Sequence, residues 1–180
     1  MKKFYYFFAM ATVALVSLCC LSACGDDDEE EYKPQSKSTY DYKFFVSDEV
    51  LALGDIDLHL KGTDIEQHIN VASQGVKSTR TYNSTDGSSK TYSGKEFIFT
   101  NIQYGQTITP SFTQNDSAVD ALPKDGKTAM AIGYKIIRHY NGEAFVVDNN
   151  ESSTGGLMNS RIMSAIYDHV KLLSYTMKLK

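Results

Sequence analysis

Residues 130–148, MAIGYKIIRHYNGEAFVVD, decide the fold that the sequence predicts. Alternate positions in the first half carry long or bulky side chains that would lie on one face of a strand: Met130, Ile132, Tyr134, Ile136 and Arg138. A period of two residues is the pattern of a β-strand. Asn141-Gly142 then favours a type I′ turn, because both residues tolerate the positive φ angles that this turn requires. The stretch therefore predicts a long antiparallel hairpin whose second strand returns over residues 143–148.

The same alternation recurs upstream. We expect strands over residues 40–46, 56–60, 65–71, 97–102 and 108–112, and a hairpin that joins 79–82 to 90–92. In the first of these strands, Phe45 falls in the more polar row with Asp41 and Lys43. Pro110 has no N–H to donate to a neighbouring strand, so the strand that contains it should lie at an edge or be interrupted.

The C-terminal stretch carries two patterns. Apolar residues at steps of three or four, from Met158 to Met177, are typical of a helix, whereas Tyr175, Met177 and Leu179 alternate as in a strand. We expect a short helix over residues 158–168 and then a final strand. The whole pattern predicts one mostly β domain over residues 39–180, an antiparallel immunoglobulin-like β-sandwich with one short C-terminal helix. A lipocalin-like β-barrel is the alternative.

The N-terminus has the pattern of a secretory signal. Lys2 and Lys3 precede an uncharged apolar run that ends in small residues. Leu21-Ser22-Ala23-Cys24 then resembles the lipobox of bacterial lipoproteins, which implies cleavage after residue 23 and a lipid thioether on the Cys24 thiol. We therefore expect residues 1–23 to be a signal peptide and Cys24 to anchor the protein in a membrane.

Behind Cys24, acidic residues follow one another without a break: Asp26, Asp27, Asp28, Glu29, Glu30 and Glu31. Like charges repel and nothing apolar is available to bury, so residues 24–38 should form a disordered tether. The run also resembles the surface-export signal of Bacteroidetes lipoproteins. That resemblance implies an outer-membrane lipoprotein exposed at the cell surface, with attachment on the periplasmic face as the alternative.

Residues 46–56, VSDEVLALGDI, also resemble a family. Small β-sandwich lipoproteins of Bacteroidetes open with a serine, two acidic residues and an apolar stretch, and continue in an alternating strand that begins at an Asp and ends at a Gly. The likeness spans residues 40–62. Because that family has no established activity, it implies no site residues.

Charge and cysteine content exclude several functions. Loss of Lys2 and Lys3 from the 18 basic residues would leave 16 against 22 acidic ones, a net charge of −6. An acidic chain repels phosphate backbones, so we expect no nucleic-acid partner. All three cysteines precede residue 25, which excludes a disulfide scaffold, a catalytic thiol and a cysteine zinc site from the predicted domain.

Recognised catalytic motifs are missing from the sequence, including Gly-x-Ser-x-Gly, a phosphate-binding glycine loop and His-Glu-x-x-His. Asp55, Asp57 and His59 would share one strand face, but neighbours on such a face stand nearly 7 Å apart, and we interpret them as a solvated surface. Carboxylate pairs such as Asp48/Glu49 and Asp55/Asp57 could form an acid–base couple, but the geometry of a glycosidase depends on a separation in space that the sequence does not supply. We expect no catalytic residue, no metal ligand and no cofactor, and keep a hydrolase as an alternative.

The expected function is non-catalytic binding or adhesion at the cell surface, with a glycan or an extracellular or envelope protein as partner. Loops 83–89, 114–125 and 148–156 are the expected contact regions, because rigid sheets present function on their connections. A carrier of a small apolar ligand is the alternative. Asp116-Ser117-Ala118 resembles the O-glycosylation motif of Bacteroidetes exported proteins, which would make Ser117 an acceptor in an exposed loop over residues 114–120.

Overall fold

The computed structural model describes residues 38–83 and 89–178. The expected signal, the lipobox with Cys24 and the acidic run all lie outside the described residues. The strands are β1 (Thr39–Ser47), β2 (Gly54–Lys61), β3 (Glu66–Asn70), β4 (Val76–Asn83), β5 (Ser89–Ile102), β6 (Thr107–Gln114), β7 (Lys127–Tyr140), β8 (Glu143–Met158) and β9 (Tyr175–Thr176). The helices are α2 (Asp48–Leu51), α3 (Val71–Gln74), α4 (Asp116–Asp120) and α5 (Asn159–Lys171).

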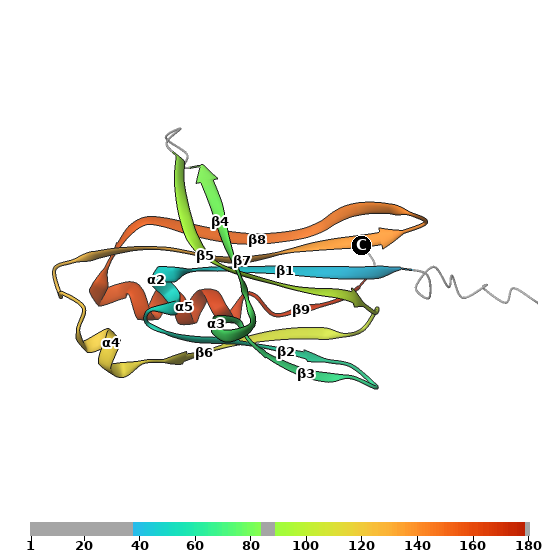
Figure 1. Cartoon of the computed structure of the whole chain (residues 1–180), viewed down its shortest axis with the longest axis horizontal. Helices are drawn as coiled ribbons and strands as arrows, with labels where there is room; N and C mark the ends of the chain where they lie inside the picture. The colour runs from blue at the N-terminus through green and yellow to red at the C-terminus, as the bar shows by residue number, and fades with distance from the viewer. Residues whose placement is uncertain (1–37, 84–88, 179–180) are drawn as a thin grey trace, which may run out of the picture. The chain divides into compact units, whose positions relative to one another are not determined.

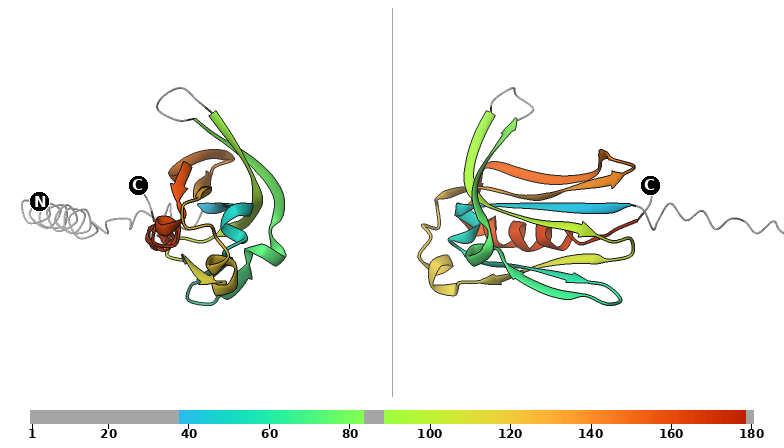
Figure 2. Two further views of the ribbon diagram at one scale, coloured as in Figure 1. Left: turned by 90° about the vertical axis from the view of Figure 1, so that its left-hand side faces the viewer. Right: turned by 45° about the vertical axis from the view of Figure 1, so that its right-hand side comes forward.

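Two antiparallel sheets face each other across the main core. One sheet has the order β4-β5-β1-β7-β8, and the other has the order β3-β2-β6-β9. Figures 1 and 2 show α5 running between the levels of the two sheets, where it packs on β6, β7 and β8. The predicted mostly β sandwich with a C-terminal helix is confirmed. The described strands form two separate sheets that do not close into a barrel.

β1 lies between β5 and β7, is buried along one face, and is buried on the other face at Phe45 and Ser47. Tyr40, Tyr42, Phe44 and Val46 belong to the main core. Phe45 points the other way and is buried in a second, smaller core with Tyr92 and Ala131. The expectation of a polar outer row in this strand is therefore wrong at Phe45, because other strands cover that face.

The β7–β8 hairpin turns as predicted. Asn141 and Gly142 have φ angles of 50° and 83°, which is the left-handed backbone of a type I′ turn. β8 does not end at residue 148, however, and continues to Met158, so the expected contact loop 148–156 is wrong. The extra length is rich in Ser, Thr and Asn, and it is a strand because β7 supplies a backbone partner as far as Lys127.

β5 joins two segments that the sequence presents as separate strands. Its C-terminal part pairs with β1, whereas residues 89–93 pair with β4 and with no other described strand. Gly94 stands at this transition, opposite Ser47 of β1 and Ser78 of β4. A Cβ atom there would collide with the backbone carbonyl of Val46, so the close crossing of the strands requires glycine.

The C-terminal segment resolves into a helix and then a very short strand. α5 extends three residues beyond the predicted end at residue 168 and buries Ile162, Ile166 and Val170. β9 pairs with Thr107 and Ile108 of β6. From residue 109 onward, and therefore at Pro110, β2 is the one described strand that pairs with β6. The expected edge or interruption at Pro110 agrees with this arrangement.

Tyr42 fixes the junction between α5 and β9. Its hydroxyl donates a hydrogen bond of 3.2 Å to the carbonyl of Leu173, and both residues are fully buried. Its ring stacks on Tyr134 at a centroid distance of 5.1 Å, and Tyr134 contacts Tyr175 at 5.7 Å. Burial raises the pKa of Tyr42 well above its ordinary value, so this hydroxyl remains a donor.

Tyr42→Phe should therefore lower the free energy of unfolding by about 1–2 kcal/mol, because it leaves a buried carbonyl without a partner and changes little else. Urea denaturation measures the difference. Tyr104→Phe is the matched control, since Tyr104 is 42% exposed whereas Tyr42 is fully buried. Equal stability of the Tyr42 and Tyr104 variants would contradict this role for the buried hydrogen bond.

Candidate functional site

β4 and the first part of β5 form a two-stranded ribbon, residues 76–83 and 89–95, that we call the β4–β5 ribbon. It leaves the sandwich at Gly94 and projects away from the other strands (Figures 1 and 2). Most of its side chains are exposed. Of the expected contact loop 83–89, residues 84–88 at the ribbon tip lie outside the described residues.

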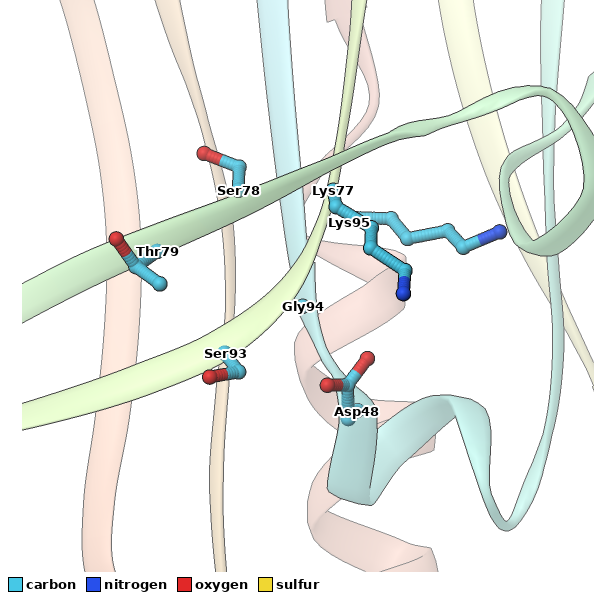
Figure 3. A pocket seen from close by; sticks show the side chains of 7 residues that line it. All are labelled: Asp48, Lys77, Ser78, Thr79, Ser93, Gly94 and Lys95. Carbon is cyan, nitrogen blue, oxygen red and sulfur yellow. The ribbon is translucent and has the colours of Figure 1, made fainter.

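A recess of about 480 Å³ lies at the base of the ribbon, where the ribbon meets α2. It is lined by Asp48, Lys77, Ser78, Thr79, Ser93, Gly94 and Lys95 (Figure 3). The lining offers ammonium groups, hydroxyls and one carboxylate, with no large apolar side chain. Its chemistry therefore suits a polar ligand rather than a lipid.

The two lysines of the recess are direct partners in the β4–β5 ladder. Like charges placed opposite each other on a sheet repel, which destabilises the pair. The ammonium group of Lys95 donates to the backbone carbonyl of Ala72 in α3, so it is held beside the recess. An anion between the two ammonium groups would remove their repulsion.

The ribbon is also a basic feature of an acidic protein. Its described residues include three lysines and Arg80 but no Asp or Glu, whereas the whole chain carries a net charge of −4. Arg80 is neutralised by ion pairs with Glu96 and Glu151. The remaining positive charges of the described ribbon residues belong to Lys77, Lys90 and Lys95.

Arg80 also holds the ribbon against the sandwich. Glu96 belongs to β5 and Glu151 to β8, so the guanidinium joins the two edge regions of the five-stranded sheet. It lies over the ring of Phe45, with 5.6 Å between its central carbon and the ring centroid. Tyr92 adds a hydrogen bond of 2.5 Å from its hydroxyl to the carbonyl of Thr154 in β8. The base of the ribbon is therefore fixed in place.

Tyr82 closes the second core beside Arg80. Its ring meets that of Tyr92 edge to face at a centroid distance of 5.8 Å. Burial, together with the nearby Glu151 carboxylate, raises the pKa of Tyr82 to about 12. The phenol is consequently neutral near pH 7 and has a packing role here.

On the other sheet, the hairpin of β2 and β3 brings His59, Glu66 and His68 together. Glu66 Oε1 lies 3.0 Å from His59 Nε2 and 3.8 Å from His68 Nε2. Sequence reasoning grouped His59 with Asp55 and Asp57, but Asp57 instead accepts a 3.0 Å hydrogen bond from Asn70. It missed Glu66 and His68 because the pairing of the two strands was not known. Positions 59 and 68 are equally far from turn residues 62–65, and that symmetry was the available signal.

The remaining titratable candidates have structural partners or lie apart. His139 Nε2 pairs with Asp41 at 2.9 Å, and His169 Nε2 lies 3.2 Å from the carbonyl of Ile132. Burial lowers the pKa of His169, which favours its neutral form. Asp48 and Glu49 are neighbours in the first turn of α2, where adjacent side chains do not face each other.

Ser117 is exposed, but its surroundings differ from the expectation. Residues 116–120 form helix α4, capped by the Asn115 side chain, so the expected loop over residues 114–120 is wrong. Asp116 supplies an acidic first turn and Asn115 an N-cap, which together favour a helix. The role of Ser117 as a glycosylation acceptor stays a prediction. The same holds for the lipobox residues Leu21, Ser22, Ala23 and Cys24 and for the export signal in residues 26–31.

Comparison with protein-family models, with curated proteins and with solved structures gives no match for this chain. Within residues 38–83 and 89–178, no helix combines the length and the apolar character needed to cross a membrane. The β4–β5 ribbon and the β2–β3 hairpin carry the clusters of charged and titratable side chains that indicate binding chemistry.

Arg80→Leu should lower the free energy of unfolding by about 2 kcal/mol, because it leaves two largely shielded carboxylates without their cation. Urea denaturation measures the loss, and adding Glu151→Gln should restore part of it. Lys77→Leu, on the exposed part of the same strand, is the control and should change stability by less than about 0.5 kcal/mol. If the Arg80 and Lys77 variants are equally stable, Arg80 does not fix the ribbon.

Proposed function

We propose that this chain is a lipid-anchored protein of the outer cell surface and that its domain binds an anionic glycan without catalysis. Support for the anchor comes from the lipobox with Cys24, and support for export comes from the acidic residues 26–31. The tether would let the domain stand away from the membrane and reach partners outside the cell.

The observation that carries the binding proposal is the lysine pair at the base of the ribbon. Lys77 and Lys95 oppose each other in the ladder and line one recess (Figure 3). A carboxylate between them would accept charge-assisted hydrogen bonds, which are stronger than bonds between neutral groups. A bound anion would therefore stabilise the lysine pair, whose two charges repel each other when no anion is present.

A sugar fits the rest of the lining. Thr79 and Ser93 are partners in the ladder and offer hydroxyls that both donate and accept, and the Asp48 carboxylate accepts from sugar hydroxyls. The overall negative charge of the protein disfavours a long polyanion. A short oligosaccharide with a single carboxylate offers hydroxyls to the lining and carries too little charge to be repelled by the acidic protein.

The alternatives have less support. A carrier of an apolar ligand needs an apolar cavity, whereas the residues that line the described recess are charged or hydroxyl-bearing apart from Gly94. A glycoside hydrolase typically needs two carboxyl groups that flank the scissile bond. The two expected carboxylate pairs consist of chain neighbours or next neighbours, Asp48 with Glu49 and Asp55 with Asp57.

Binding to an array of oligosaccharides, each present with and without its carboxylate, tests the proposal. The protein should retain acidic members and not their neutral counterparts, because the lysine pair contributes only when a carboxylate is present. Lys77→Ser with Lys95→Ser should weaken this binding at least about tenfold, since each charged hydrogen bond is worth about 1.5–3 kcal/mol.

Lys90→Ser is the matched control, because Lys90 is exposed on the same ribbon but lies outside the recess. It should leave the preference for acidic members unchanged. Equal binding of acidic and neutral members, or equal loss in the Lys90 variant and the double variant, would refute the role of the recess.

A further inference from the structure

His59 and His68 are direct partners in the β2–β3 ladder, so their side chains leave the sheet on the same face. Their rings stack with centroids 4.0 Å apart and planes inclined by 20°. Glu66 is two residues before His68 and therefore shares that face. The nearest donor atoms of the three side chains all lie within 4.8 Å of one another.

We infer that His59, Glu66 and His68 form a site for a divalent transition-metal ion of the zinc type. Zinc binds imidazole nitrogen and carboxylate oxygen at about 2.0–2.2 Å in a tetrahedron, which places neighbouring donors about 3.3–3.5 Å apart. The distances of 3.0 and 3.8 Å from Glu66 Oε1 to the two Nε2 atoms bracket that spacing. Water completes the coordination.

The surroundings allow an ion to enter. The side chains of His59, Glu66 and His68 are 31%, 61% and 66% exposed, so their rings and carboxylate can turn toward one ion. Binding requires the stacked rings to tilt until both Nε2 lone pairs converge. Lys61 stands opposite Glu66 in the ladder.

Imidazole and carboxylate donors select the ion class. Two imidazoles favour zinc, copper or nickel over calcium and magnesium, which prefer oxygen donors. A single exposed carboxylate does not make a calcium site. The next residues on the same face, Asp57 and Asn70, are hydrogen-bonded to each other and lie two positions farther along the strands.

A bound ion would fasten the edge of the second sheet. β3 is the end strand of that sheet and takes its described ladder bonds from β2. Because the ligands lie on both strands, separation of the hairpin would break the metal coordination as well as the backbone hydrogen bonds. The inference concerns the sheet opposite the β4–β5 ribbon and does not rest on the proposed glycan binding.

Isothermal titration of zinc sulfate into the full mature lipoprotein, purified in detergent with a tag that lacks histidine, tests the site. The wild-type chain should bind one ion tightly. His59→Gln, His68→Gln and Glu66→Gln should each weaken this binding at least about tenfold, because each removes one of three protein ligands. The exposed positions of all three residues allow the variants to fold, and circular dichroism checks this.

His139→Gln is the matched control, because it removes a histidine of the other sheet and leaves the acidic tether unchanged. It should retain wild-type zinc affinity. The imidazole NMR signals of His59 and His68 should shift with zinc, while those of His139 and His169 stay in place. Failure of the wild-type chain to bind zinc, or unchanged affinity in any one of the three ligand variants, overturns the proposal.

Discussion

β1 is hydrogen-bonded to β5 on one side and to β7 on the other, and it is buried along one face and, at Phe45 and Ser47, on the other face. One face supplies Tyr42 and its aromatic neighbours to the core between the sheets, and the other supplies Phe45 to the smaller core under the ribbon. Because one strand contributes to both cores, the position of the β4–β5 ribbon is tied to the position of the C-terminal helix. On one face of this strand the Tyr42 hydroxyl forms its buried hydrogen bond, and on the other face the Arg80 guanidinium forms its ion pairs.

Elements with a strong local signal could be predicted from the sequence. The Asn141-Gly142 turn, the alternation in β1 and β2, and the helical spacing of Ile162, Ile166 and Val170 each specify their structure within a few residues. Polar stretches carry no such signal. The second half of β8 is a strand because β7 lies beside it, and its Ser, Thr and Asn residues gave no indication of that partner.

The candidate sites depend on pairing between strands, which sequence periodicity does not provide. Lys77 faces Lys95, and His59 faces His68, only in the register that the hairpins adopt. The sequence placed His59 and His68 on predicted strands but joined His59 to its own-strand neighbours Asp55 and Asp57. It left Lys77 and Lys95 just outside the predicted strands 79–82 and 90–92. The hairpin that joins 79–82 to 90–92 was predicted, but its extension to Lys77 and Lys95 was not, and neither was the pairing of β2 with β3. Both were needed to identify the clusters, because each is a cross-strand pair with one or more polar residues around it.

We propose that this domain lies outside the cell, anchored through Cys24 and exported by the acidic residues 26–31. Protease treatment of intact cells, followed by detection of the domain, tests that claim most directly when the wild type is compared with a variant whose residues 26–31 are alanine. The account predicts that the wild-type domain is digested and the alanine variant is protected. Protection of both in intact cells, with digestion of both after lysis, would contradict surface exposure and place the domain in the periplasm.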